Sequence, residues 1–180
     1  MSRSIKLSEV QSFIRNGLKD RLQHDFTRTP FRIFRERDLQ ACVYVHLRKF
    51  LAGDHTWEIL NEPYLKDLKG RGKSAKPDMV LLRRNKTRLL LEFKCLGRYS
   101  GLRRREQRVM GRAVKSGIAK KCYYIEAVME GTRRTRRKPK AYVNHIVTLE
   151  MPQERQKKFR KLLVARRKPR ITRRRRAKQK

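Results

Sequence analysis

Three charged residues, Asp78, Glu92 and Lys94, border two short apolar runs, and their types suit metal-ion chemistry. Two carboxylates a few ångströms apart repel each other, so they are hard to ionise together unless a cation lies between them. Carboxylate oxygens with open water positions suit Mg²⁺ or Mn²⁺. Such a metal lowers the pKa of a bound water and stabilises charge on a phosphate under attack, while a lysine orients the water or neutralises that charge. The three residues therefore predict a hydrolytic metal site if the fold brings them together.

The spacing of these residues predicts a β-hairpin that does so. Residues 79–93 consist of two apolar runs of strand length around a polar segment that contains Asn85, a residue that readily adopts left-handed turn conformations. A turn centred on Asn85 places Asp78 opposite Glu92, and directly paired residues share a face of the sheet. The period-two alternation of a strand puts Lys94 on that face as well. The alternative is an exposed ion pair between Glu92 and Lys94 on an ordinary edge strand.

Pro77-Asp78 and Glu92-Phe93-Lys94 together resemble the motif of the PD-(D/E)XK nuclease superfamily, over about 18 residues of the chain. The resemblance implies metal ligation by Asp78 and Glu92 and a catalytic role for Lys94. It also implies a restriction-endonuclease-like or Holliday-junction-resolvase-like fold. The expected cofactor is Mg²⁺, with Mn²⁺ as a substitute.

Periodicity along the rest of the chain predicts the surrounding elements of an α/β fold. An N-terminal helix covers 8–24 with Ser8 as its N-cap, and a second helix covers 36–51 with Gly53 as its stop signal. Further elements are a strand at 55–60, a helix at 103–116 that ends at Gly117, strands at 121–129 and 141–149, and a helix at 153–166. Helix, three-stranded antiparallel meander, helix and strand is the core order of the resembled superfamily. The first helix, the last strand and helix, and a basic tail are additions to it.

Glu36 is the candidate third metal ligand. At about 100° per residue it falls near the middle of the apolar stripe formed by Leu39, Val43, Leu47 and Phe50. A carboxylate in line with an apolar face needs a partner, because an unpaired buried charge is very costly. Folds that resemble this one often supply a further acid from the helix before the sheet. The alternative is a helix N-terminal acid that the dipole favours.

Other acidic residues are weaker candidates. Glu106 lies on the apolar side of the helix at 103–116, and we expect it to be an ion-pair partner before it is a site residue. Gln107 is offset toward the edge of that face. Glu58 and Glu62 remain alternative acids for the periphery of the site.

The net charge indicates a polyanionic partner, because 51 Lys+Arg against 16 Asp+Glu give +35 over 180 residues. Two runs concentrate the excess: the loop 133–140 holds six Lys/Arg and the tail 166–180 holds ten. Basic runs contact phosphates more often than they read bases, so both are assigned to the nucleic-acid backbone. If about six to ten phosphates are neutralised, affinity falls roughly 10³–10⁵-fold between about 50 and 200 mM salt. The expected binding residues are Arg133, Arg134, Arg136, Arg137, Lys138, Arg173, Arg174, Arg175 and Arg176.

The length predicts a single domain over 1–165, with its core at about 35–130, followed by the basic tail 166–180. No apolar run approaches the roughly 18 residues needed to cross a membrane, and no signal peptide precedes the first helix. An intracellular location is therefore expected, either cytoplasmic or nucleoid-associated, or nuclear if the source is eukaryotic. The three cysteines are widely separated, which favours buried free thiols over disulfides or a zinc site.

Two classes of function agree with these features. The first is a Mg²⁺-dependent endonuclease that hydrolyses phosphodiester bonds, with DNA favoured over RNA. Small domains with such a site often dimerise to cut both strands, so a homodimer is one expectation. The second is a noncatalytic RNA- or DNA-binding structural protein, such as a ribosomal-type component, on a nuclease-like fold. The constellation of Asp78, Glu92 and Lys94 favours the first class.

Overall fold

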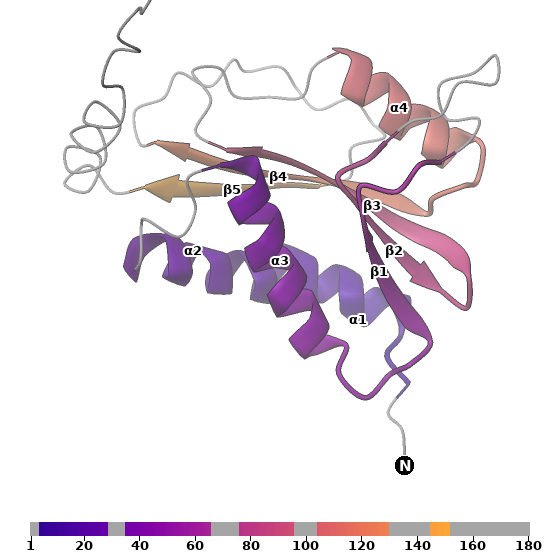
Figure 1. Ribbon diagram of the computed structural model, residues 1–180, viewed down its shortest axis with the longest axis horizontal. Coiled ribbons are helices and arrows are strands. Elements are labelled where there is room, and N and C mark those ends of the chain that lie inside the picture. Colours follow the sequence, from indigo (N-terminus) through magenta and orange to yellow (C-terminus); the bar gives the residue numbers. More distant parts are fainter. Residues whose placement is uncertain (1–3, 29–34, 66–75, 96–103, 130–144, 152–180) are drawn as a thin grey trace, which may run out of the picture.

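A computed structural model describes residues 4–28, 35–65, 76–95, 104–129 and 145–151. The chain forms a mixed α/β fold around one five-stranded sheet (Figure 1). The helices, one of them a π-helical segment, are α1 (Leu7–Ser12), η1 (Phe13–Gly17), α2 (Leu18–Arg28), α3 (Glu36–Phe50) and α4 (Arg104–Lys115). The strands are β1 (Trp57–Asn61), β2 (Met79–Arg83), β3 (Lys86–Cys95), β4 (Lys121–Met129) and β5 (His145–Met151).

The strands lie side by side in chain order, from β1 to β5. Strands β1, β2 and β3 form an antiparallel meander, whereas β4 runs parallel to β3 and β5 runs parallel to β4. The parallel step from β3 to β4 contains α4, as such a step needs a crossover connection. The predicted order of helix, antiparallel meander, helix and strand is therefore confirmed, and β5 is the added C-terminal strand.

Helices cover the two faces of the sheet unequally. The larger hydrophobic core lies between one face and the helical segments α1, η1, α2 and α3, and it includes Leu89, Leu91 and Phe93 of β3. The smaller core lies on the other face against α4, and it includes Leu90 of β3. In Figure 1, α4 accordingly lies on the opposite side of the sheet from α1 and α2. Alternate residues of one strand thus serve two different layers.

The N-terminal helical segment differs from its prediction at the start. It begins at Leu7, and the Glu9 carboxylate accepts a hydrogen bond from the Lys6 backbone N–H at 2.7 Å. Ser8 therefore lies inside the first turn and is not the N-cap, because the acid at the third helical position already holds the preceding backbone. The segment continues through the π-helical turn η1 and reaches Arg28, beyond the predicted end at His24.

The hairpin between β2 and β3 reaches the predicted register by an unexpected route. Its turn has two residues, Arg84 and Asn85, with φ angles of 49° and 60°, so the prediction of a turn centred on Asn85 was wrong. Such a turn alone would set Asp78 opposite Leu91. An extra residue in β3, Arg88, forms a bulge that moves the register by one.

Met79 consequently pairs with Leu91, and continuing this register by one residue brings Asp78 opposite Glu92. The bulge matters because a shift of one residue exchanges the faces of a strand. The register needed by the site therefore depends on an irregularity that apolar periodicity does not reveal.

Most other predicted elements agree with the structure within a few residues. The two glycines expected to end helices, Gly53 and Gly117, have φ angles of 88° and 72°, which side chains with a Cβ rarely adopt. The three cysteines are free thiols, as predicted, although only Cys122 is fully buried. None of the helices in the described ranges is long and apolar enough to span a membrane.

Three predictions fall outside the described residues. These are the basic loop at 133–140, the helix at 153–166 and the tail at 166–180. All nine arginines and lysines that were assigned to the nucleic-acid backbone belong to the loop and the tail.

Candidate active site

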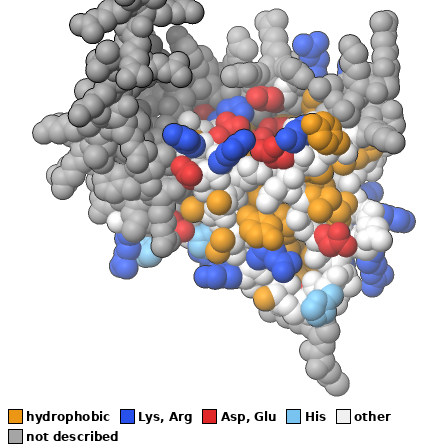
Figure 2. All heavy atoms as spheres, viewed as in Figure 1, with side chains coloured by type: hydrophobic (Ala, Val, Ile, Leu, Met, Phe, Trp, Pro, Cys, Tyr) orange, Lys and Arg blue, Asp and Glu red, His pale blue; other side chains and the backbone are white. Residues whose placement is uncertain are grey.

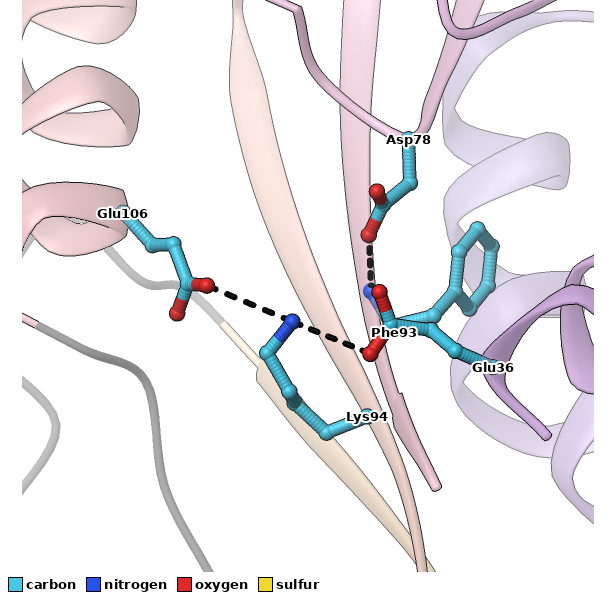
Figure 3. A network of polar contacts seen from close by, with 5 residues as sticks. All are labelled: Glu36, Asp78, Phe93, Lys94 and Glu106. Carbon is cyan, nitrogen blue, oxygen red and sulfur yellow. Dashed lines mark hydrogen bonds and ion pairs between the residues drawn. The ribbon is translucent and has the colours of Figure 1, made fainter. Parts of the chain in front are cut away.

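The three predicted chemical residues come together where β2 begins and β3 ends. Asp78 immediately precedes β2, while Glu92 and Lys94 alternate along β3 on the face that carries α4. Two helices add an acid each: Glu36 is the first residue of α3, and Glu106 lies in the first turn of α4. Figure 3 shows Lys94 reaching between these two acids, with Asp78 near the backbone of β3.

Asp78 is held through both its side chain and its backbone. One carboxylate oxygen, Oδ2, accepts a hydrogen bond from the backbone N–H of Phe93 at 2.7 Å (Figure 3). The backbone carbonyl of Asp78 accepts from the Gln40 side-chain amide at 2.6 Å and from the Glu62 backbone N–H at 2.9 Å. Contacts from α3, the end of β1 and β3 therefore fix this residue before any ligand binds.

Glu92 is the most perturbed acid of the site. Its side chain lies on the central strand β3 and is only 6% exposed, which excludes the alternative of an exposed ion pair on an edge strand. Burial, together with the charge of Asp78 and a hydrogen bond with Asp78, raises the pKa of Glu92 to about 10. A carboxyl group in this position is protonated at neutral pH unless a cation compensates its charge.

Lys94 lies between two acids. Its Nζ is 3.1 Å from Oε2 of Glu36 and 3.3 Å from Oε1 of Glu106 (Figure 3). Burial alone would lower the pKa of Lys94, but the charges of Glu106, Glu36 and Asp78 outweigh burial and raise it above its ordinary value. The ammonium group is therefore charged at neutral pH and acts as a fixed cation rather than as a base.

The other predicted acids have separate positions. Glu106 is the ion-pair partner that the sequence indicated. Glu62 pairs with Lys76 at the surface, and Glu58 is exposed on the edge strand β1. Within the described ranges, no group of three or more His, Cys, Asp or Glu side chains is placed to hold one metal ion. The Glu36 carboxylate contacts Lys94 in the structure. Its role as a third metal ligand stays a prediction.

Sequence reasoning missed two residues at the site. Gln40 follows Glu36 by one helical turn and donates to the Asp78 carbonyl, a contact that the i, i+4 spacing could have suggested. Glu126 is 5% exposed in β4 and pairs in register with Lys94. The signal for Glu126 was a single acid inside an otherwise apolar buried strand, where an acid needs a compensating group.

The donor set fits a small divalent cation. Five of the chain's 16 acidic residues contact Lys94, influence its pKa or lie beside it in the sheet, although the chain carries 51 Lys+Arg. Asp78 and Glu92 supply adjacent carboxylates, and Mg²⁺ is commonly held by one or two carboxylates with waters and substrate phosphates. A cation beside them would also offset the burial and the repulsion by Asp78 that together keep Glu92 protonated. The five acids are Glu36, Asp78, Glu92, Glu106 and Glu126.

Acidic and basic side chains also gather at the molecular surface. Figure 2 shows them in one band across the upper part of the described face, near the start of α3, with hydrophobic side chains below. Arg35 and Arg37, which flank Glu36 at the start of α3, are both exposed.

No protein-family model matches the chain, and no curated protein is significantly similar to it.

Proposed function

We propose that the protein is a Mg²⁺-dependent endonuclease that hydrolyses phosphodiester bonds, with DNA favoured as its substrate. The observation that carries this proposal is the placement of buried Glu92 beside Asp78, with Lys94 on the same face. If Glu92 had only a structural role, burying an acid that holds its proton so strongly would be unfavourable. The same burial is useful where a divalent cation replaces the proton.

In the proposed reaction, each residue of the site has a distinct task. Asp78 and Glu92 would hold Mg²⁺, which when bound lowers the pKa of its water and stabilises negative charge on the phosphate. Asp78 needs little reorganisation, because backbone and side-chain donors already fix it. Ordering the ligands in advance lowers the entropic cost of binding the ion.

Lys94 would orient the attacking water and neutralise charge on the phosphate. Its raised pKa keeps it protonated, so it donates hydrogen bonds and does not remove the proton of the water. Glu36 and Glu106 hold the ammonium group from two helices and so act as positioning residues. Preorganised charge of this kind stabilises a transition state because it does not have to reorient during the reaction.

The deciding experiment is a cleavage assay on supercoiled plasmid, a four-way junction and single-stranded RNA, each with Mg²⁺ or with EDTA. Wild type is compared with Asp78→Asn and Lys94→Ala. We expect cutting that needs Mg²⁺ and that both substitutions abolish, while Lys94→Ala still binds the substrate. Wild-type protein that binds tightly but cuts none of the three substrates would overturn the proposal.

The second candidate is a noncatalytic nucleic-acid-binding protein on the same fold. The net charge of +35 favours it as much as it favours a nuclease. The contacts of Glu36 with Lys94 and the lack of a three-acid group among the described residues also agree with it. In this case binding would be salt-sensitive and would be independent of Mg²⁺, Asp78 and Glu92.

A further inference from the structure

Tyr64 is the most exposed large hydrophobic side chain of the described residues. It is 73% exposed, and the other two, Val45 and Leu60, are aliphatic and less exposed. One exposed tyrosine alone is ordinary for a protein surface. Whether Tyr64 has a function therefore depends on its neighbours.

The backbone just before Tyr64 is tied to the candidate site. The Glu62 N–H donates to the carbonyl of Asp78, and Glu62 has a φ angle of 49° directly after β1 ends. This conformation is uncommon for a residue with a side chain, and it turns the chain at that point. Tyr64 follows two residues later, which limits its Cα to about 7 Å from that of Glu62. Tyr64 therefore lies two residues from the backbone contact that holds Asp78.

Cations border the ring. The Nζ of Lys76 lies 5.7 Å from the centre of the Tyr64 ring, within the range of a cation–π contact, and also forms an ion pair with Glu62. Arg37, next to Glu36 on α3, is exposed and is close enough for its charge to help lower the pKa of Glu62, after the larger effects of Lys76. An open aromatic surface is thus combined with two groups that attract phosphates.

Exposed aromatic rings among cations are the usual platform for single-stranded nucleic acids, because every base has a π-face that can stack on them. The bases of an intact duplex stack on each other and do not offer these faces to a protein surface. We infer that Tyr64 stacks on an unpaired base next to the phosphate that enters the site, so that the preferred substrate is single-stranded or locally unpaired nucleic acid. This inference rests on the proposed nuclease site for its reaction, but its binding step needs no cleavage.

Binding in EDTA separates the two proposals. Full-length protein is titrated with a labelled single strand of about twelve nucleotides, and with the duplex formed from the same sequence. Tyr64→Ala removes the ring, Tyr64→Phe keeps it, and Val45→Ala is a matched loss of an exposed apolar group. The melting temperature of each variant shows whether it is folded, and Tyr64 is too exposed for large losses to be expected.

We expect Tyr64→Ala to weaken single-strand binding by about 5- to 150-fold, the range for loss of one base–aromatic stack. Duplex binding should stay unchanged, and Tyr64→Phe and Val45→Ala should behave as wild type. Equal weakening for single strand and duplex, or no weakening at all, would overturn the inference. Either result leaves the nuclease proposal intact, because that proposal is decided by Mg²⁺-dependent cutting.

A second measurement reads the contact directly. Trp57 is the chain's single tryptophan and is only 3% exposed, so Tyr64→Trp adds the one exposed indole. Stacking of a base should quench its emission when the single strand is added, whereas duplex should not. Emission that does not respond to the single strand while binding proceeds would place the strand elsewhere and contradict the inference.

Discussion

The two faces of strand β3 have opposite roles. Leu89, Leu91 and Phe93 point into the large core under α1, α2 and α3, and each is fully buried. On the other face, Leu90 packs under α4, but the next two alternate residues are Glu92 and Lys94. One face therefore supplies stability along its whole length, whereas the other gives up apolar burial at one end and concentrates charge there. Titratable groups buried at such a cost are typical of functional sites.

The largest effect expected from this comparison distinguishes two aspartates that are both held by hydrogen bonds, Asp78 and Asp54. Asp54 is 5% exposed and accepts hydrogen bonds from the backbone of Ile5 and Thr56, so it is a structural acid. Asp78→Asn should lower Mg²⁺-dependent cleavage by roughly 10³-fold with little change in melting temperature, because it removes a charge that organises the transition state. Asp54→Asn should lower the melting temperature and leave the cleavage rate of folded protein near that of wild type. Similar losses of cleavage in both variants would contradict the distinction between Asp78 as a site residue and Asp54 as a structural residue.

The next effect concerns the core face. Leu91→Ala should lower the free energy of unfolding by about 2–5 kcal/mol, because it leaves a cavity in a fully buried position. Urea unfolding monitored by circular dichroism measures this loss. Below the unfolding transition, cleavage should remain, since Leu91 points away from the carboxylates. Loss of cleavage by fully folded Leu91→Ala would show that the two faces are coupled.

Much of the contrast between the two faces of β3 was predictable from the sequence. The predictions that failed did so for physical reasons. The apolar runs located the strands, and turn residues located the hairpin to within one residue. The bulge at Arg88 was not predictable from periodicity, because one extra residue in a polar segment leaves the apolar pattern intact. The register was right because two errors, in the turn and in the bulge, cancelled.

The site was predictable to the extent that local spacing determines it. Asp78, Glu92 and Lys94 lie in one hairpin, where period-two alternation and register fix their relative positions. The contacts of Gln40, Glu126 and Glu106 depend on how α3, β4 and α4 pack on that hairpin. Tertiary packing of this kind is not encoded in the periodicity of any single element.

The third effect has an unusual sign. The pKa of Glu92 is raised from 4.5 to about 10, so below pH 4.5 the group is protonated in both folded and unfolded chains and does not affect stability. Above that pH the unfolded chain releases the proton and the metal-free folded chain keeps it, so the folded state loses stability as the pH rises toward about 10. Glu92→Gln should therefore raise the free energy of unfolding in EDTA by about 1–3 kcal/mol at neutral pH.

Thermal unfolding at acidic and neutral pH tests this expectation. The advantage of Glu92→Gln over wild type should vanish at acidic pH, where both side chains are neutral. Mg²⁺ should raise the melting temperature of wild type more than that of Glu92→Gln, because the variant lacks one of the two carboxylates. Leu90→Ala, a loss of apolar volume on the same face, serves as the control, because its effect should not depend on pH or Mg²⁺. If Glu92→Gln raised the melting temperature equally at both pH values, the assignment of a raised pKa to Glu92 would be contradicted.

The smallest effect decides what Glu36 does. Glu36 and Glu106 each hold Lys94, but the Glu36 side chain is 45% exposed and that of Glu106 is 19% exposed. Exposed ion pairs contribute about 0.2–1 kcal/mol, so Glu36→Gln should slow cleavage by no more than about fivefold, and Glu106→Gln somewhat more. Mg²⁺ titrations of the cleavage rate should give the wild-type midpoint in both variants if both acids keep the contacts with Lys94 that they make in this arrangement. A midpoint shifted in Glu36→Gln as strongly as in Asp78→Asn would instead make Glu36 the third ligand, with its contact to Lys94 broken when the metal binds.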